Sequence, residues 1–403
     1  MQADIALTNG RFWTVQNDNP WVESVCANDG NIVFVGSSKD ALEYIGPVTR
    51  VIDLRGRFGL PAFNDSHVHF HPDMVGQAHR LGISCIQDIT VRSGLQDLKK
   101  MMQGGQPSLR LRLRPPLEEV HDLADYEELS ATSEGWIKLI GVKAYADGRI
   151  SDGSALFFRP AMNQQEDAQF PVIAKVDEWK RHLGAALDCG LAPSVHAMGD
   201  RAVHLVLDLF EEIRKECPNN GPRFRVVHAS VVGPGDIPRF AELGVVAEVN
   251  PVQRFAQDWL RGIIGEQVRW SFPFRSLSDS GAILCFGSDH PGPNASNPFP
   301  LDPLLGIYAA VIPTEGDPQS ELYHDESLTL EEAIEAYTIR AAYAAGEEET
   351  MGSLRCGKVA DVIVLSDDLF RVPRDRIPDV EVVLTMIGGI VVFSRTGNVS
   401  GIY

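Results

Sequence analysis

Paired cysteines are missing from this chain. Its six cysteines are scattered, with no CxxC pair or other paired spacing. Such spacing is typical of a disulfide framework or a thiolate metal site, so both are disfavoured. We expect buried, reduced thiols at Cys26, Cys85, Cys189, Cys217, Cys285 and Cys356.

Basic residues are also scarce. Lys and Arg number 36 against 55 Asp and Glu, which gives a formal net charge of −19 at pH 7. Nucleic acids and anionic membrane surfaces are bound by clustered cations that displace counterions. The charge balance therefore disfavours both as partners.

Long apolar runs are absent as well. No run approaches the roughly 20 apolar residues that span a bilayer, and the first residues lack the basic segment and apolar segment of a secretory signal. A cytoplasmic protein is expected. With 44% hydrophobic and 23% charged residues among 403, the chain can bury a large core and should form one large domain and a smaller one.

The order of predicted elements divides the chain into these two parts. Residues 1–57 and 346–403 are rich in strands, and the two ends most simply pair into one small composite β-sandwich. Residues 58–345 alternate strands with helices, which requires a parallel sheet with helices outside it. Eight strands close a (β/α)8 TIM barrel, so the expected fold class is α/β. The predicted strands are residues 59–69, 84–88, 109–114, 137–146, 192–196, 225–228, 245–250 and 283–287, and the predicted helices include 176–189, 202–216, 234–243 and 330–345.

Two histidines separated by one residue are the clearest functional signal. A strand alternates its faces, so His67 and His69 point the same way, and two imidazoles on one face can begin a metal site. Further ligand types follow, each at or near the end of its own apolar run. These are Lys143, His196, His228 and Asp289.

Side-chain parity places the candidate lysine inside the barrel. In the fourth strand, Lys143, Tyr145 and Asp147 share one face, while Val142 lies on the opposite face. Lys138 has the parity of the helix-facing side, so it is the weaker candidate. The polar candidates thus converge at the carboxyl-terminal mouth, where such barrels carry their chemistry.

With these motifs the chain resembles the metal-dependent amidohydrolases, and in particular the YtcJ-like branch, also called the amidohydrolase 3 group. The resemblance implies a barrel with a composite β-sandwich, and hydrolysis of a C–N bond with one or two divalent metal ions. The motifs run nearly end to end: NGR at 9–11, GLPAFNDSHVH at 59–69, VKAYADG at 142–148, HAMGDRAV at 196–203, VHA at 227–229, GSD at 287–289 and GSLRCGKVAD at 352–361.

The resemblance also implies a metal-binding role for each candidate. A set of imidazole and carboxylate ligands without a thiolate suits a hydrolytic metal, with zinc as the first choice. Asp289 would also take a proton from the attacking water and pass it to the leaving amine. By position, His67, His69 and Asp289 would bind the more buried metal ion. His196 and His228 would bind the second ion. Lys143, as a carbamate (N6-carboxylysine), would bridge the two.

Some roles stay open. Lys143 could instead be an unmodified lysine paired with Asp147 or Asp289. His290 could reach the substrate or serve the structure. Three residues near the mouth are candidates for substrate binding: Tyr145, Arg149 and His290.

Two departures from the family pattern bear on its transfer. Relatives of this branch usually carry a long insertion after the HxH strand, whereas about ten residues, 71–80, stand here. Substrate specificity is therefore not transferable. Val227 stands where the family often has Glu, so the family's surroundings of His228 are not transferable either.

We therefore expect a metal-dependent hydrolase of an amide or related C–N bond in a small-molecule substrate, with Asp289 as general base and acid. A deaminase of a heterocycle is the alternative among enzymes, although no Glu follows His196 closely to protonate the ring. A non-catalytic scaffold on the same fold is the alternative from another class. Both a monomer and a homo-oligomer stay open.

Overall fold

Two parallel sheets form the centre of the structure, a computed structural model that describes residues 2–89, 92–103, 108–164, 170–216, 221–292, 298–313 and 325–395. Their strand orders are β11-β10-β9-β8 and β12-β13-β14-β15-β16. All eight predicted strand regions are present in them. The strands are β8 (Phe63–Val68), β9 (Ile83–Asp88), β10 (Arg110–Leu113), β11 (Ile137–Leu139), β12 (Gly141–Tyr145), β13 (Ala192–Ala197), β14 (Arg225–His228), β15 (Val246–Val249) and β16 (Leu284–Phe286).

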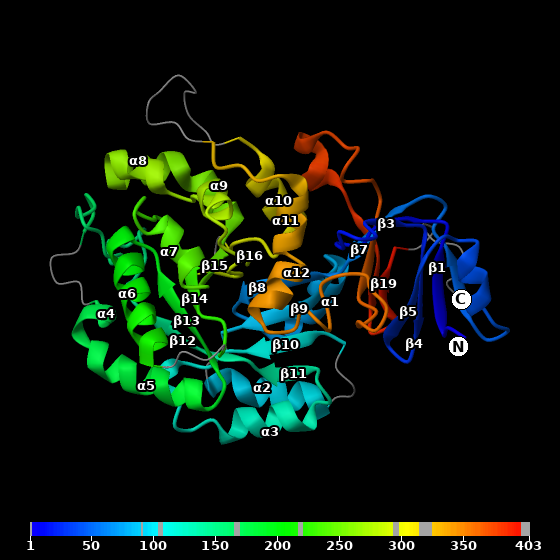
Figure 1. Cartoon of the computed structure of the whole chain (residues 1–403), viewed down its shortest axis with the longest axis horizontal. Coiled ribbons are helices and arrows are strands. Elements are labelled where there is room, and N and C mark those ends of the chain that lie inside the picture. The colour runs from blue at the N-terminus through cyan, green and yellow to red at the C-terminus, as the bar shows by residue number, and fades with distance from the viewer. Residues whose placement is uncertain are drawn as a thin grey trace.

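Helices follow most of these strands and flank the two sheets (Figure 1). This alternation is the α/β pattern that the sequence predicts. The helices are α1 (Val75–Arg80), α2 (Arg92–Gln103), α3 (Ala124–Thr132), α4 (Pro171–Ala174), α5 (Val176–Asp188), α6 (Asp200–Glu216), α7 (Ile237–Glu242), α8 (Gln257–Ile264), α9 (Phe274–Asp279), α10 (Pro303–Val311), α11 (Leu330–Ala336) and α12 (Ile339–Ala344).

The two parallel sheets touch at two places. At one, the backbone N–H of Asp289 donates to the carbonyl of His67 at 2.8 Å; at the other, the N–H of Lys143 donates to the carbonyl of Pro115 at 2.8 Å. The strand pairings there are isolated bridges rather than ladders. Closure into an eight-stranded barrel therefore stays a prediction.

Strands from the two ends of the chain share one sheet. Its order is β19-β18-β17-β7-β2-β3, and a second sheet, β5-β4-β1-β6, lies beside it at one side of the molecule (Figure 1). Leu7, Ile52, Val362 and Leu384 belong to one buried apolar cluster that joins the sheets. A composite sandwich and its domain boundaries stay predictions. The strands are β1 (Ile5–Thr8), β2 (Arg11–Trp13), β3 (Trp21–Val22), β4 (Ser24–Asn28), β5 (Asn31–Gly36), β6 (Arg50–Asp53), β7 (Phe58–Pro61), β17 (Val362–Leu365), β18 (Val382–Ile387) and β19 (Ile390–Ser394).

Three predicted elements are each divided in two. The predicted strand 59–69 is β7 and β8, because β7 pairs with β17 and β2 of the other sheet. The predicted strand 137–146 is β11 and β12, which belong to different sheets. The predicted helix 330–345 is α11 and α12. It breaks at Thr338, where φ is −128° and ψ is −97° and the hydroxyl donates to the carbonyl of Ile334 at 2.7 Å.

The cysteines are free thiols in the described part of the chain. The expectation of burial is right for Cys26, Cys85 and Cys285 and wrong for Cys189 and Cys356, which are exposed; Cys217 lies outside the described residues. Within the described ranges, no helix has the length and apolar character needed to cross a membrane.

Candidate metal centre

Three of the predicted ligands meet where β8 ends and the chain leaves β16. The Nε2 atoms of His67 and His69 lie 3.2 and 3.3 Å from the same oxygen, Oδ1, of Asp289. One potential ligand atom from each residue lies within 4.8 Å of the other two. His67 and Asp289 are buried, whereas His69 is 46% exposed, so the group is open on the side of His69.

His196 and His228 lie next to this group on the neighbouring strands β13 and β14. Their ring centroids are 4.5 Å apart, and the ring of His228 is 5.0 Å from that of His67. Neither belongs to the group of three. Burial lowers the pKa of His196 to about 3 and that of His228 well below its ordinary value. Both imidazoles are therefore neutral at pH 7, the form that binds a metal.

Lys143 is buried beside these histidines. Its Nζ has no hydrogen-bond partner among the described residues. Within the same residues, Lys143 also forms no ion pair with Asp147 or Asp289. Burial lowers the pKa of the Lys143 amine to about 7, and a buried polar group without a partner is destabilising. Lys138 faces away, with Nζ 2.5 Å from Glu347 Oε1, as its parity predicts.

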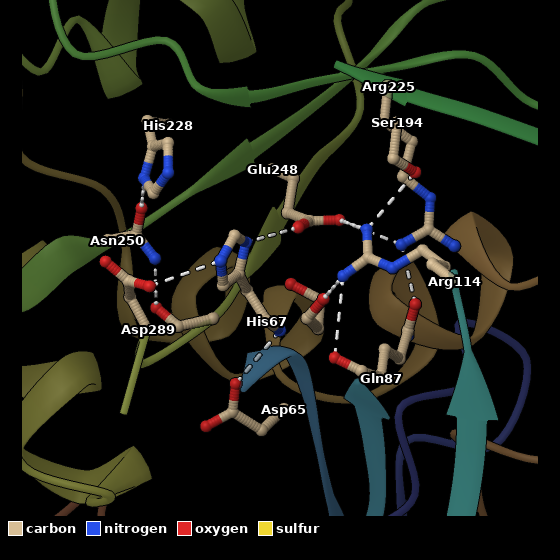
Figure 2. A network of polar contacts seen from close by, with 12 residues as sticks. Asp65, His67, Gln87, Arg114, Ser194, Arg225, His228, Glu248, Asn250 and Asp289 are labelled. Atoms are coloured by element: carbon tan, nitrogen blue, oxygen red, sulfur yellow. Dashed lines mark hydrogen bonds and ion pairs between the residues drawn. The ribbon is translucent and has the colours of Figure 1, made fainter. Parts of the chain in front are cut away.

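A buried carboxylate that the sequence analysis missed holds His67. Oε1 of Glu248, on β15, lies 2.8 Å from His67 Nδ1, and Oε2 accepts from Arg114 and Arg225 at 2.7 and 2.9 Å (Figure 2). Burial raises the pKa of Glu248, but Arg114, the hydrogen bond from His67 and Arg225 together hold it well below the usual range. An ionised carboxylate only accepts, so Nδ1 of His67 carries the proton and Nε2 is free to bind a metal.

Two more side chains orient the site. Asn250 Oδ1 lies 2.6 Å from His228 Nδ1, which also leaves Nε2 of His228 free if Nδ1 donates. Asp65 Oδ1 accepts from the backbone N–H groups of His67 and Ser288 at 3.2 and 2.9 Å. Asp65 therefore fixes β8 against the segment after β16.

The backbone is strained at two of the candidate ligands. His228 and Asp289 adopt left-handed φ values of 73° and 58°. Such values are unfavourable for residues other than glycine, by about 1–3 kcal/mol, and they cluster at functional sites. Here they turn both side chains toward His67.

A cavity of about 910 Å³ contains all the candidate ligands in its wall. Tyr145 and Arg149 also line this cavity, so their substrate-binding roles remain open predictions. His290 is not among the lining residues; its Nδ1 lies 2.5 Å from the carbonyl of Phe299, which gives the side chain a structural contact instead.

Comparison with known proteins places these features in a family. The model of a family described as "Amidohydrolase family" matches residues 72–393. Protein LONG AFTER FAR-RED 3 of Arabidopsis thaliana is 31% identical over 354 residues, which cover 86% of this chain and 54% of the relative. N-substituted formamide deformylase of Arthrobacter pascens is 30% identical over 247 residues, which cover 57% and 44%. The chain thus spans about half the length of these relatives.

Solved structures share the fold. An uncharacterized metal-dependent hydrolase from Pyrococcus horikoshii OT3 superposes with a TM-score of 0.74 at 20% identity, over 92% of this chain and 99% of that chain. An adenosine deaminase from Xanthomonas campestris with bound zinc superposes with a TM-score of 0.66 at 15% identity, over 98% and 93%. At these identities the likeness shows the fold alone.

Proposed function

Because the chain belongs to the amidohydrolase family, we propose that it is a metal-dependent hydrolase of an amide or related C–N bond in a small molecule. The observation that carries the proposal is the convergence of His67, His69 and Asp289 in the wall of a large cavity. The relative named N-substituted formamide deformylase supports an amide as the substrate.

The donor set fits one or two divalent ions. Neutral imidazoles and a carboxylate suit zinc, and the zinc in the deaminase that shares the fold supports this choice. His67, His69 and Asp289 would hold the first ion. The second would be held by His196 and His228, with Lys143 reaching both as a carbamate.

The environment of Lys143 supports this modification. Carbamate formation joins the amine nitrogen to the carbon of CO₂ and releases a proton, so it needs the neutral amine. A lysine whose pKa is about 7 supplies that form at neutral pH, whereas an exposed lysine with a pKa of about 10.4 does not. The product is an anion, which suits a position between two cations.

Asp289 is the residue that would move the proton. When bound, a divalent ion would polarise the scissile carbonyl and let water ionise near neutral pH. Burial raises the pKa of Asp289, but the close approach of the His67 and His69 rings to its Oδ1 holds this pKa well below the usual range. The carboxylate is thus ionised and can accept a proton from the attacking water and return it to the leaving amine.

Family membership also supports the finer description of the fold. We infer that the two parallel sheets close into a (β/α)8 barrel, because backbone hydrogen bonds join the sheets at two places, between the segment after β16 and β8 and between β12 and the segment after β10. We also infer that the two terminal sheets form a composite β-sandwich, because they share one apolar cluster.

A deaminase is the second candidate. The compact group of three ligand atoms would serve a single metal, which is the usual number for that reaction. Product analysis separates the two: an amidase releases a carboxylic acid and an amine, whereas a deaminase releases ammonia and leaves the ring intact.

Metal content and its removal test the proposal. We expect elemental analysis of the purified protein to find about one to two divalent ions per chain, and a chelator to abolish amide hydrolysis that added zinc restores. Full activity in metal-free protein would overturn the mechanism. Protein that binds no divalent ion under any loading condition would point to the non-catalytic scaffold.

A further inference from the structure

We propose that the substrate is an uncharged amide that carries an aromatic or similarly bulky apolar group, and that Phe255 and Trp259 bind this group. The inference rests on the proposed hydrolase function and adds the chemical class of the substrate. Its basis is the part of the cavity wall that lies beyond the candidate metal ligands.

One wall of the cavity is apolar and partly uncovered. It is formed by the short helix η4 (Pro251–Ala256) and by α8, which follow β15 along the chain. Phe255 and Trp259 line the cavity and are 45% and 50% exposed. An aromatic side chain buries about 150–250 Å² when fully covered, so a ligand in the cavity can cover apolar surface that the fold leaves in contact with water.

Other loops give the cavity further apolar lining. They include the end of β12 and the segments that follow β9, β12 and β13 or lie beyond β16. Because these segments line the same cavity, an apolar group would meet apolar surface on more than one side. The side chains concerned are Ile89, Tyr145, Ile150, Met198 and Phe299.

Beyond the candidate metal ligands, the described lining contains one guanidinium, and it faces a carboxylate of the chain itself. Arg149 and Lys143 are the lining residues of the Lys and Arg type in the described chain. Nε and Nη2 of Arg149 lie 2.9 and 2.8 Å from Asp152 Oδ2, and Asp152 Oδ1 also accepts from the backbone N–H of Ser154 at 3.1 Å. Lys143 lies buried among the candidate ligands. A substrate carboxylate away from the metals would have to compete with Asp152 for Arg149, whereas an uncharged apolar group has no such requirement.

The size of the cavity also favours a substrate with a bulky substituent. At about 910 Å³ it lies in the upper range of sites that enclose ligands of drug size. An amide with two small substituents would fill little of this space. A bulky apolar substituent would displace water from the wall and contribute roughly 1.5–3 kcal/mol if fully buried, or about 10- to 100-fold in affinity.

Calorimetric titration tests the class of ligand without depending on turnover. Metal-free full-length protein is titrated with N-benzylacetamide, N-methylacetamide and N-(4-carboxybenzyl)acetamide. We expect the benzyl compound to bind at least about tenfold more tightly than the other two, with a negative heat-capacity change from apolar burial. Equal or tighter binding of the carboxylate or of the methyl compound would overturn the inference, as would no detectable binding of the benzyl compound.

Substitutions in the apolar wall identify the residues involved. Trp259→Ala and Phe255→Ala should each weaken binding of N-benzylacetamide about tenfold and leave N-methylacetamide unaffected. Phe158→Ala is the matched control, because Phe158 is an aromatic residue 56% exposed outside the lining residues. If both wall variants bind the benzyl compound as the wild type does, the assignment is wrong.

Hydrolysis by the zinc-loaded enzyme separates this inference from the proposed function. If benzyl amides are cleaved, Trp259→Ala should raise KM about tenfold with kcat unchanged, and an unchanged KM would count against the assignment. If no amide is cleaved although the titration shows the expected preference, the proposed function fails and the inferred ligand class stands.

Discussion

The protonation of single ring nitrogens determines what the candidate site can bind. His67 has Nδ1 facing Glu248, and His228 has Nδ1 facing Asn250. With a proton on each Nδ1, each Nε2 presents a lone pair toward the other candidate ligands. Partners of this kind fix the tautomer and ring orientation of metal-binding histidines. We therefore regard Glu248 as a positioning residue for His67.

Replacing Glu248 should weaken metal binding. In Glu248→Gln the amide oxygen can still accept from His67, but the charge facing Arg114 and Arg225 is lost. We expect the affinity for zinc, measured by competition with a chromophoric chelator, to fall about 10- to 100-fold. Stability should fall by about 3–5 kcal/mol, since a buried ion pair is broken.

A second buried carboxylate separates these two effects. Glu347 pairs with Arg112 and Lys138 away from the metal ligands. Glu347→Gln should also lower stability, yet leave zinc affinity as in the wild type. Equal zinc affinity in both variants would contradict the role of Glu248.

Asp289 should be needed for turnover more than for folding. In Asp289→Asn the amide cannot accept a proton at neutral pH, so we expect kcat to fall by on the order of a hundredfold or more. Much of the bound metal should remain, which elemental analysis can check. Asp258→Asn, on the exposed side of α8, is the control. An unchanged kcat would remove Asp289 from the proton transfer.

Lys143→Ala should remove a bridging ligand. We expect loss of the second metal ion and most activity, and partial recovery of both with acetate or propionate, since a small carboxylate can occupy the vacated space. Electron density in crystals of zinc-loaded protein grown with bicarbonate should extend beyond the Lys143 amine. Density that ends at Nζ would reject the carbamate and the bridged pair of ions.

At the scale of elements, the periodicity of the sequence predicts which face of a strand a side chain lies on, but not which distant residue it contacts. Parity in one strand is sufficient to place Lys143 on the cavity side and Lys138 on the other. Glu248 lies in an apolar run, where a charged residue is itself a signal, yet its partner Arg114 is 134 residues away. No local pattern records such a pairing. The convergence of the candidate ligands on one cavity was therefore predictable, whereas the contacts of Glu248 with His67 and of Asn250 with His228 were not.

Strand breaks show the same limit. The sequence alone predicts one strand over 59–69, because both halves are apolar and extended. The structure divides it into β7 and β8 since β7 pairs with β17, about 300 residues later in the chain. The helix over 330–345 likewise breaks where Thr338 bonds to the preceding turn. Local propensity thus predicts the type of each element, whereas the break in the strand depends on a distant partner and the break in the helix on a single hydroxyl contact.

The close approach of β12 and β13 gives a prediction at this scale. A Cβ on Gly141 would lie 2.3 Å from the carbonyl oxygen of Ala192, a backbone atom that cannot move without its strand. Gly141→Ala should therefore shift Lys143 relative to His196 and lower stability by about 1–3 kcal/mol in urea unfolding, with less metal bound.

A glycine in open space is the matched control. Gly184 lies within α5, and a Cβ there would meet nothing within 4 Å. Gly184→Ala should be neutral or stabilising by up to about 1 kcal/mol. If Gly141→Ala behaves in the same way, the contact between β12 and β13 does not set the position of Lys143.

At the scale of the whole molecule, the terminal strands are tied to the parallel sheets. β7 pairs with β17 on one side and with β2 on the other, and one residue separates it from β8, which carries His67. The side chain of Arg110, on β10, makes a buried ion pair with Asp361 at 3.0 Å. Strand pairing and a buried ion pair therefore link the sheets that carry the candidate metal centre to the ends of the chain.

This connection gives the last prediction, that removal of residues 353–403 leaves no soluble, metal-binding protein. Without β17 the edge of β7 is unpaired, and an unpaired apolar edge promotes aggregation. The deletion also leaves Arg110 buried without a carboxylate, which is destabilising by about 3–5 kcal/mol, and uncovers Leu7 and Ile52 of the shared cluster. Expression followed by sedimentation and calorimetry should find the shortened chain in the insoluble fraction.

Asp361→Asn in the full chain isolates the ion pair and should give soluble protein with a lowered Tm. A shortened chain that stays soluble, melts as the wild type does and binds zinc would show that the parallel sheets fold independently of the chain ends.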